Sequence, residues 1–336
     1  MPSLTGASGG SPGRRPGHIY RVTIHVGFTD GGERGEAMRR GRSIVVGVDG
    51  TGSARDALDW AAAEAAVRQL PLRVVHAYAA APSWAVTGEV PCPYENFGVP
   101  DVARAVTEQA VRRAREVAAE LEISTRLVLG AGAPALLAQC DDAELLVLGS
   151  RGRGGVWGVF GGSVSCRVAM HAACPVVVVR PMRPAEPGRS AARVVVGVDG
   201  SSGSTRAVEF AVRAAAQRGV GVTAVHAWAP RGTADLAAVT DDWSLAEAAE
   251  WRTLQRVFAP WRSRLGPARI DLRLVPGRAQ DALVAESAGA ALVVVGTRGR
   301  GSVRAALAGS VSQAVLQRAG CPVAVVRVGG RGLMER

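Results

Sequence analysis

The hydrophobic pattern of the chain alternates between short apolar runs and longer helical stretches, and the whole alternation occurs twice. Helical stretches lie at about 53–69, 101–121 and 133–139, and again at about 202–218, at 241–265 and after Gly277. Apolar runs of strand length lie at 43–49, 72–77, 123–129 and 145–149, and again at 193–199, 222–227, 270–275 and 292–296. Because continuous Val and Leu runs favour strands buried on both faces, this order predicts parallel sheets wound with right-handed helical crossovers.

One stretch carries the clearest repeat. Leu145–Arg180 and Leu292–Arg327 each contain an apolar strand, a Gly/Arg-rich loop, a Gly-Ser pair, a helical run, Cys-Pro and a last apolar strand. The repeat predicts two similar α/β domains at 42–181 and 193–328, joined by a linker at 182–192 and followed by a tail at 329–336. Residues 1–41 are expected to be a disordered extension because they are rich in Gly, Arg, Ser and Pro. The alternation in HIYRVTIHV, residues 18–26, could form a stray strand within it.

The Gly/Arg-rich loop has the composition of an anion site. Its spacing is Gly149, two residues, Gly152, nine residues, then Gly162 and Ser163, and the second copy has Gly296, Gly299, Gly309 and Ser310 at the same spacing. Glycine lets a ligand approach the main chain, and a serine at a helix N-terminus stands beside free backbone N–H groups. Phosphate is the usual occupant of such a place. A flexible surface loop with an ordinary cap is the alternative, but the matched spacing of these glycine and serine residues in both copies favours phosphate.

Two acidic residues precede the first helix of each domain. Asp49 and Asp199 end the first strands, and the carboxyl ends of strands one and four lie together if these strands are neighbours. The carboxylates could contact a ligand there, or could instead cap the following helix as structural Asx residues. Ser53 or Thr51 can also cap the first helix. His76 and His226 are interpreted as core histidines. Arg151, Arg153, Arg298 and Arg300 could pair with phosphate or be solvated loop residues.

Composition excludes several kinds of function. The net charge of +11 comes without any lysine, which excludes a Walker A lysine and a Schiff base. The sequence contains no basic patch interleaved with aromatic residues, so nucleic-acid binding is not expected. No apolar run approaches the ~20 residues of a membrane span, and no signal pattern opens the chain, so a cytoplasmic protein is expected. The five cysteines show no metal-ligand spacing, so no metal site is expected, and Cys174 and Cys321 are interpreted as small buried thiols.

These motifs resemble those of the universal stress protein (UspA-type) family. The resemblance rests on G-x-x-G, nine residues and G-S, with VVVGVDGS opening the second domain and CPVVVVR closing the first, and it covers 43–181 and 193–328. It implies a tandem member of the ATP-binding branch, with two doubly wound, Rossmann-like, five-stranded parallel sheets in strand order 3-2-1-4-5. It also implies an intramolecular pseudo-dimer through the last strands. Gly47 and Gly197 depart from members that carry proline there.

The resemblance also implies a set of binding residues. Asp49 and Asp199 would lie near the adenosine, and Ala77 and Ala227 would line the adenine pocket. The phosphate and ribose loop would comprise Leu148, Gly149, Gly152, Gly162, Ser163 and Val164 in the first copy, and Val295, Gly296, Gly299, Gly309, Ser310 and Val311 in the second.

The expected function is regulation or stress response through ATP binding, with Mg²⁺ bridging the phosphates as a further expectation. No Ser/His/Asp constellation is evident, so catalysis is not expected. A slow ATPase or a phosphoryl or nucleotidyl transferase is one alternative, and a scaffold that binds no nucleotide is another. Pairing of two chains into a homodimer is left open.

Overall fold

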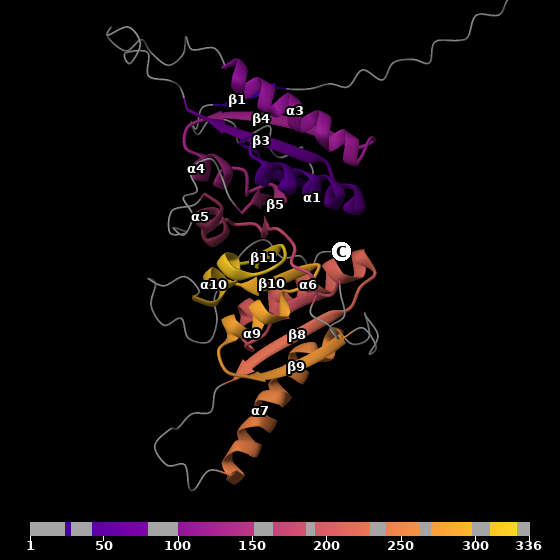
Figure 1. Ribbon diagram of the computed structural model, residues 1–336, viewed down its shortest axis with the longest axis vertical. Coiled ribbons are helices and arrows are strands. Elements are labelled where there is room, and N and C mark those ends of the chain that lie inside the picture. The colour runs from indigo at the N-terminus through magenta and orange to yellow at the C-terminus, as the bar shows by residue number, and fades with distance from the viewer. Residues whose placement is uncertain are drawn as a thin grey trace, which may run out of the picture.

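A computed structural model describes residues 24–27, 42–79, 100–150, 164–185, 192–228, 240–261, 270–297 and 310–327. For 24–27, 240–246 and 310 it describes the backbone alone. The described strands form one sheet in the order β1-β4-β3-β2-β5-β6-β11-β10-β7-β8-β9 (Figure 1). The first repeat supplies one half of this sheet and the second repeat the other.

The first repeat is a doubly wound parallel sheet. Its strands are hydrogen-bonded in the order β4-β3-β2-β5-β6, which confirms the predicted order 3-2-1-4-5. Its elements are β2 (Ser43–Gly47), α1 (Gly52–Arg68), β3 (Leu72–Tyr78), α3 (Asp101–Val117), β4 (Ile123–Leu129), α4 (Gly132–Leu137), β5 (Ala143–Gly149), α5 (Val164–His171) and β6 (Val176–Val179).

The second repeat has the same winding, with the parallel order β9-β8-β7-β10-β11. Its elements are β7 (Val194–Gly197), α6 (Ser202–Arg218), β8 (Val222–Trp228), α7 (Thr240–Phe258), a 3-10 turn η3 (Ala259–Trp261), β9 (Ile270–Pro276), α9 (Ala279–Glu286), β10 (Leu292–Gly296), α10 (Ser310–Arg318) and β11 (Val323–Val326). The two tandem α/β domains expected from the repeated pattern are therefore present.

The two repeats join through their last strands. β6 and β11 pair antiparallel, with Val177 opposite Ala324, which confirms the expected pseudo-dimer within one chain. The Arg180 guanidinium reinforces the junction because it donates hydrogen bonds to the carbonyls of Leu316, Gln317 and Ala319 at the C-terminal end of α10. Cationic groups stabilise a helix at this end, where the last carbonyls lack partners within the helix.

Helices cover both faces of the shared sheet. α1, α3, α6 and α7 pack on one face, and α4, α5, α9 and α10 pack on the other. Alternate strand residues enter opposite cores, so that Val46 and Val147 face the first set of helices whereas Leu146 and Leu148 face the second. Each core runs across both repeats, which makes the junction part of the hydrophobic interior.

A buried charge cluster links α1 to α6 beside this junction. Glu64 forms ion pairs with Arg68 of its own helix and with Arg218 of α6, each with an N–O distance of 2.5 Å. The side chains of Glu64 and Arg68 are 5% and 6% exposed. The arginines also stack reciprocally, Arg68 over the ring of Phe210 and Arg218 over Trp60. The cluster therefore fastens one repeat to the other with fixed geometry.

Some sequence predictions of local structure were wrong. The sequence suggests Asp101 as the N-cap of α3, but Pro100 holds that position without a side-chain hydrogen bond. Asp101 lies in the first turn instead, where its charge suits the helix dipole. α3 ends at Val117 rather than near residue 121. In α7 the regular helix ends at Phe258 instead of near 265, and residues 262–269 lie outside the described part.

The alternation at residues 18–26 does include a strand. β1 (Ile24–Gly27) pairs parallel with β4 at the edge of the first repeat, so the N-terminal extension expected to be disordered contributes a strand to the sheet. Among the described helices, none combines the length and the apolar character needed to cross a membrane.

Candidate functional site

The candidate site lies at the carboxyl ends of β2 and β5 in the first repeat, and of β7 and β10 in the second. β2 and β5 are neighbours, with Val46 opposite Val147, so Asp49 and Gly149 end adjacent strands at the same sheet edge. The pairing of Val196 with Val294 places Asp199 and Gly296 in the same relation. The predicted apposition of the acidic residue and the glycine loop is therefore confirmed at the level of the strands.

Asp49 and Asp199 have a structural role in this edge. Oδ1 of Asp49 accepts hydrogen bonds from the Thr51 N–H at 3.0 Å and from Thr51 Oγ1 at 2.6 Å. Thr51 Oγ1 in turn caps α1 by accepting from the Ala54 N–H at 3.3 Å. Asp199 makes the same two bonds to Ser201, at 2.9 and 2.6 Å. The Asx-turn alternative weighed from the sequence is thus observed, and contact with a ligand stays a prediction.

Backbone geometry explains the glycine that follows each aspartate. Gly50 and Gly200 have φ of 80° and 76°, in the left-handed region that glycine adopts without strain. The turns are therefore alike in both repeats, and each presents its aspartate at the start of a helix.

The histidines support the same edge from the core. His76 Nδ1 contacts the Val48 carbonyl at 2.7 Å, and His226 Nδ1 contacts the Val198 carbonyl at 2.6 Å. Both side chains are buried, and His226 also pairs with Glu250 of α7 through Nε2 at 2.8 Å. The interpretation of these residues as core histidines is confirmed.

Small and apolar residues line the part of the edge that faces α4 and α5. Leu148 and Val295 are 3% exposed, whereas Ala77 is half-buried against the same core, and Ala227 is half-buried at the equivalent position. Val164 begins α5 with 42% exposure. A Cβ placed on Gly132 would lie 3.4 Å from a Val164 methyl group, so the starts of α4 and α5 meet here. Val311, at the start of α10, packs partly buried against the same core.

Serine residues that the sequence reasoning missed fix the helix to the strand. Ser165 Oγ donates to the Gly149 carbonyl at 2.6 Å and so holds the first turn of α5 against the end of β5. Ser312 is the equivalent residue and is 1% exposed. The repeated Ser-Val-Ser tripeptides, 163–165 and 310–312, were the available signal.

Five of the twelve residues predicted for the phosphate and ribose loops cannot be located. Gly152, Gly162, Ser163, Gly299 and Gly309 lie outside the described residues, and so do the four loop arginines named above. Ser310 is the first residue of α10, and its backbone alone is described. The structure therefore brings together the predicted site residues that lie at the ends of strands. The predicted residues of the loop stay untested.

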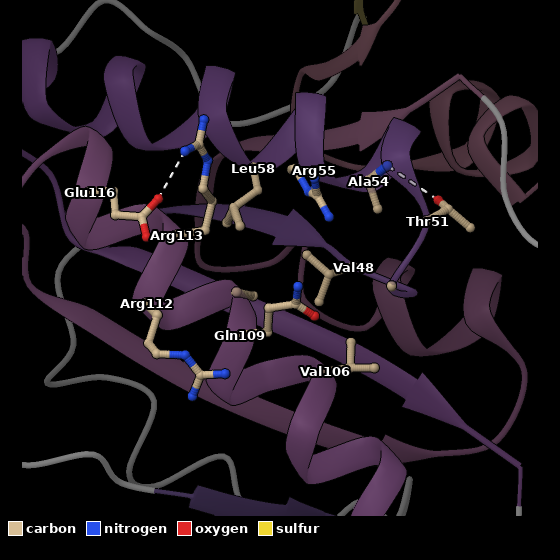
Figure 2. Close-up of a pocket in the computed structure, with 12 residues that line it drawn as sticks. Val48, Thr51, Ala54, Arg55, Leu58, Val106, Gln109, Arg112, Arg113 and Glu116 are labelled. Carbon is tan, nitrogen blue, oxygen red and sulfur yellow. Dashed lines mark hydrogen bonds and ion pairs between the residues drawn. The ribbon is translucent and has the colours of Figure 1, made fainter.

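A cavity of about 490 Å³ lies on the other face of the same sheet, between α1 and α3 (Figure 2). It shares the turn at Gly50 and Thr51 with the candidate site, but Ala77 and Leu148 lie on the opposite side of the sheet. Its lining combines an apolar floor with exposed guanidinium groups at the rim: Val48, Gly50, Thr51, Ala54, Arg55, Leu58, Val106, Gln109, Ala110, Arg112, Arg113 and Glu116. The sequence pattern gave no indication of this cavity.

Within the described residues, no three His, Cys, Asp or Glu side chains lie close enough together to hold a metal ion.

Comparison with known proteins gives a consistent result over almost the whole chain. The model of the universal stress protein family matches residues 41–180 and 191–327. Universal stress protein Rv2005c of Mycobacterium tuberculosis is 37% identical over 296 residues, which are 86% of this chain and 98% of that protein. Universal stress protein Rv2623 of the same organism is 37% identical over 84% of this chain and 96% of its own length. The crystal structure of a universal stress protein from Archaeoglobus fulgidus covers 85% of this chain and 98% of its own at 18% identity, with a TM-score of 0.53, and so supports the fold alone.

Proposed function

The chain belongs to the universal stress protein family, and we propose from this premise that each repeat binds ATP at the carboxyl edge of its sheet. The proposed output is regulation in the cytoplasm, with nucleotide binding itself as the signal. Two sites within one chain would then respond to the same ligand.

One observation supports the proposal most. In both repeats an aspartate turn, the glycine that ends the fourth strand and the small residue after a core histidine converge on one sheet edge. Edges of this kind, where strand order reverses, are the usual ligand sites of doubly wound sheets. The half-buried Ala77 offers an apolar contact suited to a purine, and the starts of α5 and α10 offer backbone N–H groups suited to phosphate.

Binding without turnover is the output that we propose. Phosphoryl transfer would need carboxylates that hold metal ions and a group that positions the nucleophile. Asp49 Oδ1 and Asp199 Oδ1 each accept two hydrogen bonds within their own turns. The residues that would contact ATP are therefore assigned binding and orienting roles, and pairing with a second chain would have to use a surface other than β6 and β11.

Isothermal titration calorimetry of the full chain with ATP tests the proposal. Wild type is expected to show two binding sites, Gly162→Val one, Gly309→Val one, and the double variant none, because each added side chain fills the backbone approach in one repeat only. Phosphate release, measured in parallel, is expected to be negligible. A circular dichroism spectrum of each variant controls for folding.

Two results would replace the proposal with its alternatives. Sustained phosphate release at saturating ATP would make the protein a hydrolase or transferase. Heat no greater than dilution in wild type, with Mg²⁺ present, would leave a scaffold without a nucleotide. An unchanged affinity in the folded double variant would remove the glycine loop from the site.

A further inference from the structure

The cavity between α1 and α3 has no part in the nucleotide site proposed above. It lies on the face of the sheet opposite Ala77 and Leu148 and has a volume of about 490 Å³. That volume is in the range of pockets that hold small organic ligands. Its walls come from two helices and from the turn after β2, so the folded first repeat forms it by itself. The cavity is therefore a candidate for a second kind of ligand.

The floor of the cavity is apolar. Val48, Ala54, Leu58 and Ala110 line it, and all four are buried. Val106 lines it from α3 and packs, partly buried, against the same core. None of these side chains carries a hydrogen-bonding group, so the deep part of the cavity suits a hydrocarbon group better than a polar one.

The rim of the cavity carries positive charge. Three arginines line it, and Arg113 is neutralised by ion pairs with Asp59 and Glu116, each at 2.8 Å. Arg55 of α1 and Arg112 of α3 come from the two helices that bound the cavity (Figure 2). Both are exposed, and neither side chain has an ion pair or a hydrogen bond with any described residue. Two guanidinium groups without a carboxylate partner in the described part therefore stand at the edge of an apolar floor.

The second repeat shows that the fold does not require small residues on this floor. From α3 onward, equivalent residues are 147 positions apart, as Gly149 and Gly296 are, and this register sets buried helix positions against buried ones. In it, α7 has bulkier side chains where α3 packs on α1: Leu254 for Thr107, Val257 for Ala110 and Phe258 for Val111.

The two arginines without partners are also specific to the first repeat. Thr205 stands in place of Arg55, 150 positions later, as Asp199 does for Asp49. Ala259 stands in place of Arg112. Small floor residues and arginines at the rim thus occur together in one repeat and are replaced together in the other, which is expected of a ligand site and not of a general packing feature.

We propose that this cavity binds a medium-chain fatty acid, with the hydrocarbon chain on the apolar floor and the carboxylate at Arg55 and Arg112. Guanidinium groups match carboxylate oxygens both in charge and in hydrogen-bond geometry. Burial of the chain supplies most of the affinity, whereas the arginines select an anionic head group over an uncharged one. The ligand is the free acid in water, and its binding neither needs nor consumes a nucleotide.

Isothermal titration calorimetry of the full chain with decanoate tests the proposal. The titration is done below the micellar concentration of decanoate and without nucleotide, and one decanoate per chain is expected to bind. Decan-1-ol keeps the hydrocarbon chain without the charge, and acetate keeps the charge without the chain. Each is expected to bind about tenfold more weakly than decanoate, or weaker still.

Three variants locate the site. Ala110→Leu should abolish decanoate binding, because the larger side chain fills the floor between α1 and α3. The double variant Arg55→Gln/Arg112→Gln should weaken decanoate binding about tenfold and leave decan-1-ol binding unchanged. Arg104→Gln is the matched control, because Arg104 is an exposed arginine of α3 outside the lining, and it should bind decanoate as wild type does. A circular dichroism spectrum of each variant controls for folding.

Several results would overturn the proposal. Decanoate could give no heat beyond dilution, decan-1-ol could bind as tightly as decanoate, or the folded arginine double variant could keep the wild-type affinity. Binding of several decanoates per chain, with no loss in Ala110→Leu, would also overturn it, because this is the behaviour of a detergent on a protein surface. Co-sedimentation with phosphatidylglycerol vesicles in place of decanoate binding would do so too, and would assign the arginines to a lipid surface.

Discussion

Glu64→Gln is expected to lower the free energy of unfolding by about 3–5 kcal/mol, because it removes the only negative charge between two arginines inside a packed interface. The Glu64 carboxylate pairs with both Arg68 and Arg218, and its side chain is 5% exposed. Without it, two guanidinium groups remain desolvated beside each other with no carboxylate between them. Urea denaturation followed by circular dichroism measures the change.

A solvent-exposed ion pair on α3 of the first repeat provides the control. Glu116 pairs with Arg113 at 2.8 Å, but its side chain is 63% exposed, so Glu116→Gln is expected to cost at most about 0.5 kcal/mol. The Glu64 variant should also separate the unfolding of the two repeats, which calorimetry would record as a split or broadened transition. A Glu64→Gln protein as stable as Glu116→Gln would show that the buried cluster contributes nothing net.

Gly149→Ala is expected to destabilise the protein by about 1–3 kcal/mol, the usual cost of overpacking a core. A Cβ at this position would overlap the backbone carbonyl of Ser53, and backbone in the first turn of α1 cannot move aside as a flexible side chain would. At the equivalent Gly296 the nearest atom, the Gly203 carbonyl oxygen, would lie 2.9 Å away, so Gly296→Ala should cost less. Thermal unfolding of both variants gives the comparison.

Gly52→Ala is the matched control for helix α1 itself. No atom lies within 4 Å of a Cβ placed there, and Gly52 is the first residue of the helix. The substitution should therefore be neutral or stabilise by up to about 1 kcal/mol. Equal losses at Gly52 and Gly149 would contradict the packing explanation for Gly149.

The Gly149 result bears on how the candidate site is tested. The sequence suggested that this glycine exists to let a ligand approach, but the structure gives it a packing reason that needs no ligand. A loss of ATP binding in Gly149→Ala would therefore not separate a damaged fold from a damaged site. Gly162 and Gly309 are better positions for the calorimetric test, provided that the variants keep a wild-type circular dichroism spectrum.

The sequence predicted the sheet well because the relevant signals are local or repeated. Buried Val and Leu runs indicated the strands of the two repeats, and the family resemblance implied a strand order in which strands one and four are neighbours. The role of Asp49 was harder, because an Asx turn and a ligand contact require the same residue at the same place. Helix ends were missed where Pro100, instead of the acidic residue beside it, starts α3.

The family resemblance implied that the last strands of the two repeats pair, but the side-chain contacts between the repeats could not be predicted from the sequence. Glu64 and Arg68 look like an ordinary i,i+4 pair on a solvated helix, and only the packing of α1 near α6 shows that the pair is buried with Arg218.

The antiparallel pairing of β6 with β11 sets the valency of the protein. Because the two halves are covalently continuous, their association has no concentration dependence, and dilution cannot generate isolated halves. Exchange of repeats between different molecules is also excluded while β6 and β11 stay paired, so every molecule carries one copy of each repeat. A preparation should therefore keep a constant ratio of first-repeat to second-repeat sites from nanomolar to millimolar concentrations, and any difference in affinity between them would be a fixed property of each molecule.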